Sequence, residues 1–173
     1  MSPRVRPRAV MVGAPGAGKS TIGAMVAEAL GVAFRDVDSD IEALAGKPIP
    51  DIFVDDGEEH FRALESRAME AALATFDGVL ALGGGAVLAP ANRAMLAGHT
   101  VVYLVVDVAD AISRVGLGQG RPLLALNPRA TLRHLLNQRR PLYEEVATVT
   151  VNTDGRTPED ITADVLKQLD DAH

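Results

Sequence analysis

The sequence predicts a single α/β domain in which helices cover both faces of a parallel sheet. Four short runs of mostly β-branched and aliphatic residues have the continuous apolar character of buried parallel strands, over 9–12, 78–82, 101–106 and 148–151. A fifth and weaker run covers 32–37. Helical patterns lie between these runs, and strands that alternate with helices form an α/β/α sandwich with right-handed crossovers.

Helical segments are expected over 19–30, 57–76, 130–146 and 157–169. The first ends before Gly31, a residue type that is common at helix C-termini. The last begins at Thr157, which we expect to be the N-cap, and Pro158 then occupies the first helical position. Periodicity and end signals therefore agree on where these helices lie.

Length and composition narrow the class of protein. The 173 residues suffice for one domain, 1–173, and contain no repeat or linker. The absence of cysteine excludes disulfides and thiolate metal sites. The net charge of −6 argues against general nucleic-acid binding, and no run approaches the roughly 20 apolar residues of a membrane span. No signal-peptide h-region follows the basic N-terminus. We therefore expect a cytoplasmic enzyme that binds neither nucleic acid nor membrane. We also expect it to be a monomer.

One stretch departs from regular structure. Residues 115–130 contain three glycines and two prolines, which predicts a surface segment rather than a core element. We expect this segment to move, and we place a mobile lid at about 116–128.

The strongest motif lies between the first predicted strand and the first predicted helix. Residues 13–20 match G-x-x-x-x-G-K-[ST] in full, in the strand–helix context that this phosphate-binding motif requires. Its glycines allow backbone N–H groups to surround phosphate oxygens at a helix N-terminus. Lys19 is expected to span the β- and γ-phosphates, and the Ser20 hydroxyl to bind Mg²⁺. The nucleotide-binding residues predicted here are Gly16, Ala17, Gly18, Lys19, Ser20 and Thr21.

Two carboxylates follow the second predicted strand. Asp36 and Asp38 are two residues apart in a segment expected to be extended, so both side chains should point toward the phosphates. One could hold water on Mg²⁺ while the other accepts the proton of an attacking hydroxyl. The alternative is that Asp38 or Ser39 only caps a helix.

Glycine-rich backbone follows the third strand. Gly83, Gly84 and Gly85 would allow a ligand to approach the main chain closely, although a flexible turn is an equal alternative. No Asp follows this apolar run, so the metal carboxylate common at this position is missing. Asp36 is therefore the best candidate for a metal ligand besides Ser20.

Several arginines could complete a site for a small anionic acceptor. Arg62 lies on the long predicted helix with Glu65 one turn later, which could orient the guanidinium. Arg139 and Arg140 precede Pro141, and Arg121 lies in the glycine-rich segment. Each arginine alone is more often a solvated surface charge. Together they could supply the carboxylate-binding fork and the phosphoryl-binding cation of a small-molecule kinase.

The order of these motifs resembles that of the shikimate kinase family over nearly the whole chain. The motifs are the phosphate-binding loop, "DVD", "FRALE", "GGGA", "RPLL" and "RRPLY". The resemblance implies a five-stranded parallel sheet in the order 2-3-1-4-5, with a P-loop and a mobile lid. It also implies that ATP phosphorylates the 3-hydroxyl of shikimate, on the pathway to chorismate and the aromatic amino acids, with Mg²⁺ as cofactor.

The resemblance implies a role for each matching residue. Asp38 matches the residue that contacts the 3-hydroxyl and acts as base, with Lys19 and Arg121 as the catalytic phosphate cations. Ser20 and Asp36 match the magnesium positions. The shikimate-binding residues would be Asp38, Arg62, Gly83, Gly84, Gly85 and Arg139. The nucleotide would further contact Arg114, Arg121, Arg156 and Pro158, with Arg114 and Pro158 flanking the adenine.

The chain departs from the family pattern in one respect, and a neighbouring arginine offers an alternative. Many members carry Ser or Thr just before the triple glycine, where this chain has Ala81 and Leu82. The family arginine stands two residues before the proline of the last motif, which selects Arg139, although Arg140 could substitute.

Two other functions compete with this interpretation. A gluconate or nucleoside monophosphate kinase would share the P-loop and lid, but Arg62, Arg139 and the glycines suit a carboxylated polyol better. A guanine-nucleotide switch would carry N-K-x-D, and the nearest stretch, "VNTDG", lacks the lysine. A catalytically inactive homologue would be expected to have lost Lys19, Asp38 or Arg121, and this chain retains all three.

Overall fold

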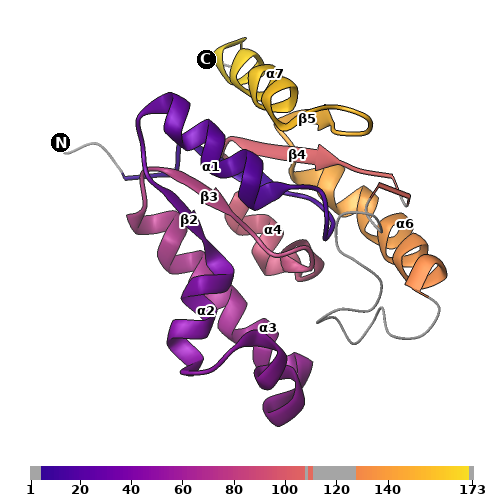
Figure 1. The fold of residues 1–173 in the computed structure, drawn as a ribbon. Helices are drawn as coiled ribbons and strands as arrows, with labels where there is room; N and C mark the ends of the chain where they lie inside the picture. The colour runs from indigo at the N-terminus through magenta and orange to yellow at the C-terminus, as the bar shows by residue number, and fades with distance from the viewer. Residues whose placement is uncertain (1–4, 108, 111–127, 172–173) are drawn as a thin grey trace.

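The computed structural model describes residues 5–107, 109–110 and 128–171. Within these residues, five parallel strands form one sheet in the order β2-β3-β1-β4-β5 (Figure 1). The strands are β1 (Ala9–Val12), β2 (Phe34–Asp36), β3 (Val79–Ala81), β4 (Val101–Val105) and β5 (Val149–Asn152). The fold class that the sequence predicted and the strand order that the family resemblance implied are both confirmed.

Helices cover both faces of the sheet. They are α1 (Lys19–Leu30), α2 (Val37–Ala45), α3 (Ile49–Thr75), α4 (Pro90–Leu96), α6 (Pro128–Val146) and α7 (Pro158–Asp171), with a 3₁₀ turn η1 (Ala86–Leu88). Helices α1 and α7 pack on one face, while α3, α4 and the end of α6 pack on the other (Figure 1). The result is a three-layer α/β/α sandwich.

Strand alternation divides the core in two. Along β1, Ala9 and Met11 face α1 and α7, whereas Val10 and Val12 face α3. All four side chains are buried, with at most 1% of their surface exposed. A central parallel strand covered on both sides needs a continuous apolar run, which explains the strength of its signal in the sequence.

Two helix boundaries predicted from the sequence are confirmed, the end of the first helix and the start of the last. Helix α1 ends at Gly31, whose φ of 71° lies in the left-handed region that glycine tolerates. At the start of α7, the Thr157 hydroxyl accepts a hydrogen bond of 3.1 Å from the N–H of Asp160. A capping hydroxyl of this kind satisfies one of the orphan donors of the first turn.

The expectation that 32–37 is extended is wrong at its end. The strand stops at Asp36, and helix α2 begins at Val37, so Asp38 lies in the first helical turn. The N-cap is Asp36, which accepts a 2.9 Å hydrogen bond from the N–H of Asp38. Asp36 and Asp38 therefore do not point the same way by strand alternation, and neither Asp38 nor Ser39 is the cap.

Two further elements differ from expectation. Helix α3 begins at Ile49 rather than near residue 57, and it contains a break at Gly57, with φ 85° and ψ 168°. Helix α4 was not predicted, because its seven residues carry too short a pattern. The positions of Arg114 and Arg121, and of the predicted lid up to residue 127, lie outside the described residues.

No helix in the described part of the chain has both the length and the apolar character that crossing a bilayer requires.

We predict that Leu80→Ala lowers the free energy of unfolding by about 2–5 kcal/mol, because it leaves a cavity in the core. Leu80 lies on β3 and is fully buried. Leu44→Ala is the matched control, since Leu44 is 51% exposed and should change stability by no more than about 0.5 kcal/mol. Urea denaturation of both variants measures the difference. Equal losses at the two positions would contradict the assignment of the core.

Candidate functional site

The phosphate-binding loop connects β1 to α1 at the carboxyl edge of the sheet. Gly16 and Gly18 adopt φ values of 84° and 89°, which side chains with a Cβ rarely adopt. Gly18 is also the N-cap of α1, and Lys19 is its first residue. The predicted nucleotide-binding residues 16–21 thus form the loop and the first turn of a helix, where N–H groups are available to an anion.

Ser20 and Asp36 lie side by side although they come from different elements. The Ser20 hydroxyl donates a 2.8 Å hydrogen bond to Oδ2 of Asp36. A hydroxyl and a carboxylate so close together form an oxygen donor set of the kind that Mg²⁺ prefers. The two residues predicted as metal ligands therefore fit a magnesium ion.

Lys19 is oriented toward the loop itself. Its Nζ donates hydrogen bonds to the carbonyl oxygens of Gly13 at 2.8 Å and Ala14 at 3.0 Å. The ammonium group is therefore already inside the loop that would receive the phosphates.

The triple glycine lies against the carboxylates of α2 and α3. A methyl group at Gly83 would lie 3.1 Å from Oε2 of Glu65 and 3.2 Å from Oδ1 of Asp38. A methyl group at Gly84 would lie 2.9 Å from the Pro15 ring of the P-loop. The glycines thus form a close junction between the phosphate loop and the two carboxylates, rather than a loose turn.

Arg62, on α3, lies beside both Glu65 and the triple glycine. Its Nη1 pairs with Oε1 of Glu65 at 2.9 Å, as the one-turn spacing predicted. A methyl group at Gly85 would collide with the Arg62 guanidinium. Only a residue without a side chain allows the arginine to lie directly on the loop backbone.

Glu65 is the electrostatic centre of the group. Burial raises the pKa of its carboxyl above the ordinary value, and the nearby positive charges of Arg62 and Arg139 oppose this effect. The negative charge of Asp38 raises the pKa further. Two carboxylates and two guanidinium groups therefore lie within electrostatic reach of one another.

Arg139 and Arg140 differ sharply in their surroundings. Arg139 is 6% exposed and lies close enough to Glu65 to affect its pKa. Arg140 is exposed and lies beside the Tyr103 hydroxyl instead. The geometry brings Arg139, and not its neighbour, together with Arg62.

Unpaired polar atoms concentrate at this position. The buried side-chain atoms without a hydrogen-bond partner in the described residues include Arg62 Nε, Glu65 Oε2 and Arg139 Nε. Buried polar groups are normally satisfied, so each exception needs an explanation. These three atoms belong to the group around Glu65, which therefore has donors and an acceptor available for a polar ligand.

Sequence reasoning missed two contacts of this site. Pro15 touches Gly84, and the Tyr143 hydroxyl donates a 2.6 Å hydrogen bond to the Gly84 carbonyl. Tyr143 stands four residues after Arg139 on α6, so the spacing already placed both side chains on one helical face. No sequence signal indicated the contact of Pro15.

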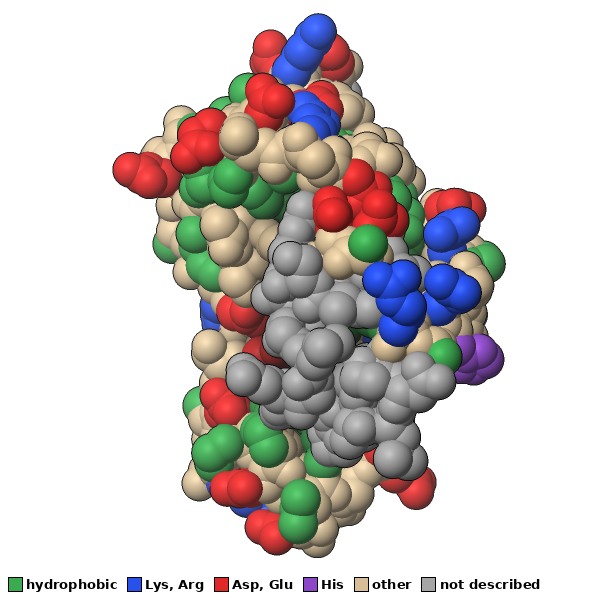
Figure 2. Space-filling model, turned by 45° about the vertical axis from the view of Figure 1, so that its right-hand side comes forward, with side chains coloured by type: hydrophobic (Ala, Val, Ile, Leu, Met, Phe, Trp, Pro, Cys, Tyr) green, Lys and Arg blue, Asp and Glu red, His purple; other side chains and the backbone are tan. Residues whose placement is uncertain are grey.

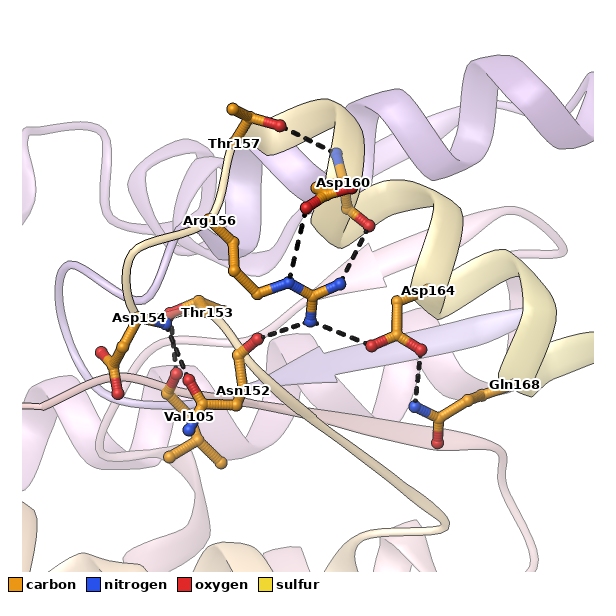
Figure 3. A network of polar contacts seen from close by, with 9 residues as sticks. All are labelled: Val105, Asn152, Thr153, Asp154, Arg156, Thr157, Asp160, Asp164 and Gln168. Atoms are coloured by element: carbon orange, nitrogen blue, oxygen red, sulfur yellow. Dashed lines mark hydrogen bonds and ion pairs between the residues drawn. The ribbon is translucent and has the colours of Figure 1, made fainter.

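Two of the residues predicted to contact the nucleotide, Arg156 and Pro158, lie just before and at the start of α7. Arg156 donates hydrogen bonds to the carbonyl of Asn152 at 2.9 Å and to Asp164 at 3.0 Å (Figure 3). It also donates to the carbonyl of Asp160 at 3.3 Å. Pro158, the first helical residue, is exposed. The guanidinium thus fixes the β5–α7 connection.

Another acidic cluster lies at the ends of β4 and β5. In the described residues, the carboxylates of Asp107, Asp110 and Asp154 approach within 4.8 Å of one another. Each accepts a backbone N–H: Asp107 from Asp110, Asp154 from Asp107, and Asp110 from Gly155. These bonds explain the cluster as a brace of two loops.

Surface charge is mixed on the face that Figure 2 shows. Acidic side chains are spread over its upper and lower parts, and the basic side chains form small separate groups. An anionic ligand therefore depends on specific arginines and lysines rather than on a broad positive field.

Comparison with known proteins identifies the family. The shikimate kinase family model matches residues 15–170. A shikimate kinase of Salinispora arenicola is 66% identical over 163 residues, which cover 94% of this chain and 98% of the relative. The solved structure of a shikimate kinase from Acinetobacter baumannii in complex with shikimate is 38% identical, with a TM-score of 0.89 over 96% of this chain and 94% of that one.

A gluconokinase structure from Sinorhizobium meliloti matches less well, with a TM-score of 0.60 and 23% identity over 98% of this chain and 94% of that one. That likeness concerns the fold alone. The matched motifs, the sheet order and the high identity of the relatives agree, and the chain belongs to the shikimate kinase family.

Proposed function

We propose that this chain transfers the γ-phosphoryl group of ATP to the 3-hydroxyl of shikimate, giving ADP and shikimate 3-phosphate. The observation that carries the assignment of its site is the pair of arginines, Arg62 and Arg139, whose buried Nε atoms are unpaired close to Asp38 and the triple glycine. Such a site suits a small polyol with one carboxylate. In the cell the product would feed the synthesis of chorismate and the aromatic amino acids.

Arg62 and Arg139 hold the carboxylate of the acceptor. A planar guanidinium meets a carboxylate through two parallel hydrogen bonds, which a lysine cannot reproduce. Glu65 fixes Arg62 through the 2.9 Å ion pair at Nη1, and Glu58 lies 3.4 Å from Nη2. The Nε atom has no partner and is available to the acceptor. Gly83, Gly84 and Gly85 line the same pocket with backbone.

Asp38 acts as the base. Its carboxylate lies next to Gly83, at the junction between the acceptor pocket and the P-loop. There it accepts the proton of the attacking hydroxyl as the oxygen bonds to phosphorus. The first turn of α2 fixes its backbone, because the Asp38 N–H is bonded to Asp36.

The P-loop holds the triphosphate. Backbone N–H groups of residues 16–21 bind phosphate oxygens, and Lys19 turns from the loop carbonyls to the transferring group. Ser20 and Asp36 would hold Mg²⁺, which would supply positive charge next to the phosphate oxygens. Asp36 thereby replaces the carboxylate that is missing after Ala81 and Leu82.

The remaining roles are predictions from the sequence. Arg114, Arg156 and Pro158 contact the nucleotide, and Arg121 reaches the phosphates from the lid at about 116–128. The lid belongs to the single domain 1–173, and it would keep water from the phosphoryl group. We expect the enzyme to act as a cytoplasmic monomer.

We predict that shikimate is the preferred acceptor in an ADP-release assay with Mg²⁺ and ATP. Quinate and gluconate also carry a carboxylate and hydroxyl groups, so they test the shape of the pocket rather than its charge. A nucleoside monophosphate tests the alternative kinase class. Faster turnover of gluconate or of the nucleotide than of shikimate would overturn the proposed function.

We predict that Asp38→Asn lowers kcat by about 10²–10⁴-fold, because the amide cannot accept a proton. Both Michaelis constants should change little. Asp40→Asn is the matched control in the same helical turn, since Asp40 pairs with Arg35 at 2.8 Å. Steady-state kinetics distinguish the two variants, and a kcat near the wild-type value in Asp38→Asn would show that this residue is not the base.

We predict that Arg139→Lys raises the KM for shikimate about tenfold or more, with the KM for ATP unchanged. Hydrogen bonds to charged groups contribute about 1.5–3 kcal/mol, and about 1.4 kcal/mol corresponds to a factor of ten. The control is Arg140→Lys, at the exposed neighbouring position. The assignment of Arg139 is wrong if the two variants have the same KM for shikimate.

A further inference from the structure

We infer that Tyr143 is a positioning residue for acceptor binding, which holds the Gly84 carbonyl and the Arg139 guanidinium in a fixed relation. The inference rests on the acceptor-binding role proposed for Arg139. It adds a residue that does not itself contact the acceptor but determines the shape of the pocket.

The geometry of Tyr143 joins two segments far apart in the chain. Its hydroxyl on α6 donates a 2.6 Å hydrogen bond to the carbonyl of Gly84, 59 residues earlier. The side chain is 1% exposed, and its ring packs on Tyr103 with a centroid distance of 5.1 Å. The ring contact fixes the direction in which the hydroxyl points.

The single hydroxyl proton determines the order of the contacts. A tyrosine hydroxyl has one donor, which the Gly84 carbonyl takes, and its oxygen can still accept. The Arg139 side chain stands one helical turn before Tyr143 and lies close enough to this hydroxyl to affect its pKa. Because arginine has only donors, its polar contact is with the acceptor side of the hydroxyl. Arg139, Tyr143 and Gly84 therefore form one chain of polar contacts, in which the hydrogen bond from Tyr143 to Gly84 is the central link.

The hydroxyl keeps its proton over the whole useful pH range. Burial raises the pKa of Tyr143 to about 12, although the charge and hydrogen bond of Arg139 oppose this change. The bond to Gly84 therefore does not depend on pH near neutrality.

The Gly84 carbonyl is a sensitive point of the pocket. Glycine backbone has more conformational freedom than that of other residues, so a triple glycine needs external contacts to remain in one conformation. The same peptide group joins Gly84 to Gly85, and Gly85 lies against the Arg62 guanidinium. Fixing this one carbonyl therefore orients the loop toward both arginines.

The next turn of the chain is held from another side. Asn92 donates a 2.9 Å hydrogen bond to the Ala86 carbonyl, and Arg93 donates a 2.8 Å hydrogen bond to the Val87 carbonyl. Helix α4 thus secures η1, whereas α6 secures the glycines through Tyr143. Removing the Tyr143 hydroxyl should loosen the glycines without unfolding η1.

The test is Tyr143→Phe, which keeps the buried ring and removes only the hydroxyl. We expect the KM for shikimate to rise about tenfold, with the KM for ATP within twofold of the wild-type value. Tyr103→Phe is the matched control, because Tyr103 is 6% exposed, belongs to the same ring pair and has its hydroxyl beside Arg140. It should leave both Michaelis constants within twofold.

This readout separates positioning from stability. KM does not depend on the concentration of active enzyme, so a partly unfolded variant loses apparent kcat without a change in KM. Melting temperatures of both variants record any loss of stability independently. If Tyr143→Phe and Tyr103→Phe have the same KM for shikimate, Tyr143 is only a core residue and the inference is overturned.

The Arg139→Lys variant distinguishes a failure of the inference about Tyr143 from a failure of the proposed acceptor site. A raised KM in Arg139→Lys together with a normal KM in Tyr143→Phe would overturn the inference and leave the acceptor site intact. A normal KM in Arg139→Lys would overturn the acceptor site and, with it, the role of Tyr143. We expect the double variant to raise KM by less than the product of the single effects, since both act on one chain of contacts. Effects that multiply fully would contradict that coupling.

Discussion

The ion pair between Arg62 and the buried carboxylate of Glu65 is the interaction on which the rest of the site depends. The Glu65 side chain is 1% exposed, and a carboxylate taken out of water so completely needs a paired charge. Arg62 supplies that charge at 2.9 Å, and in doing so it lies flat against the backbone of Gly85. The buried carboxylate thus fixes a guanidinium in the pocket before any acceptor arrives, which is the preorganisation that tight and selective binding requires.

The second constraint is the contact between the phosphate loop and the glycines. Gly84 lies against the Pro15 ring, while Gly83 lies beside Asp38 and Glu65. These contacts place the group that donates phosphate and the group that receives it on adjacent pieces of backbone. Phosphoryl transfer depends mainly on positioning and on charge stabilisation, so such a junction contributes directly to the reaction. Tyr143 extends the junction to α6, and so to Arg139.

Local signals predicted most of the fold and the phosphate-binding half of the site. Strand β1 and helix α1 have sharp boundaries in the sequence because a buried apolar run and a Gly C-cap define them locally. Helix α2 was missed because Asp36 ends the strand by capping the helix, which no periodicity reveals. The contacts of Tyr143 with Gly84 join residues 59 apart and exist only in the packed structure. The predictions for Arg114 and Arg121 concern residues outside the described ranges.

The central claim is that Arg62 and Arg139 select the acceptor by its carboxylate. The most direct measurement compares the KM of shikimate with that of its neutral carboxamide, in the wild-type chain and in Arg62→Ala. The account predicts that the carboxamide raises KM about tenfold or more in the wild type, since it loses hydrogen bonds between charged groups. In Arg62→Ala the same replacement should cost much less, because one of the two partners is already absent. Equal penalties in both proteins would contradict the account, since Arg62 would then not contact the carboxylate.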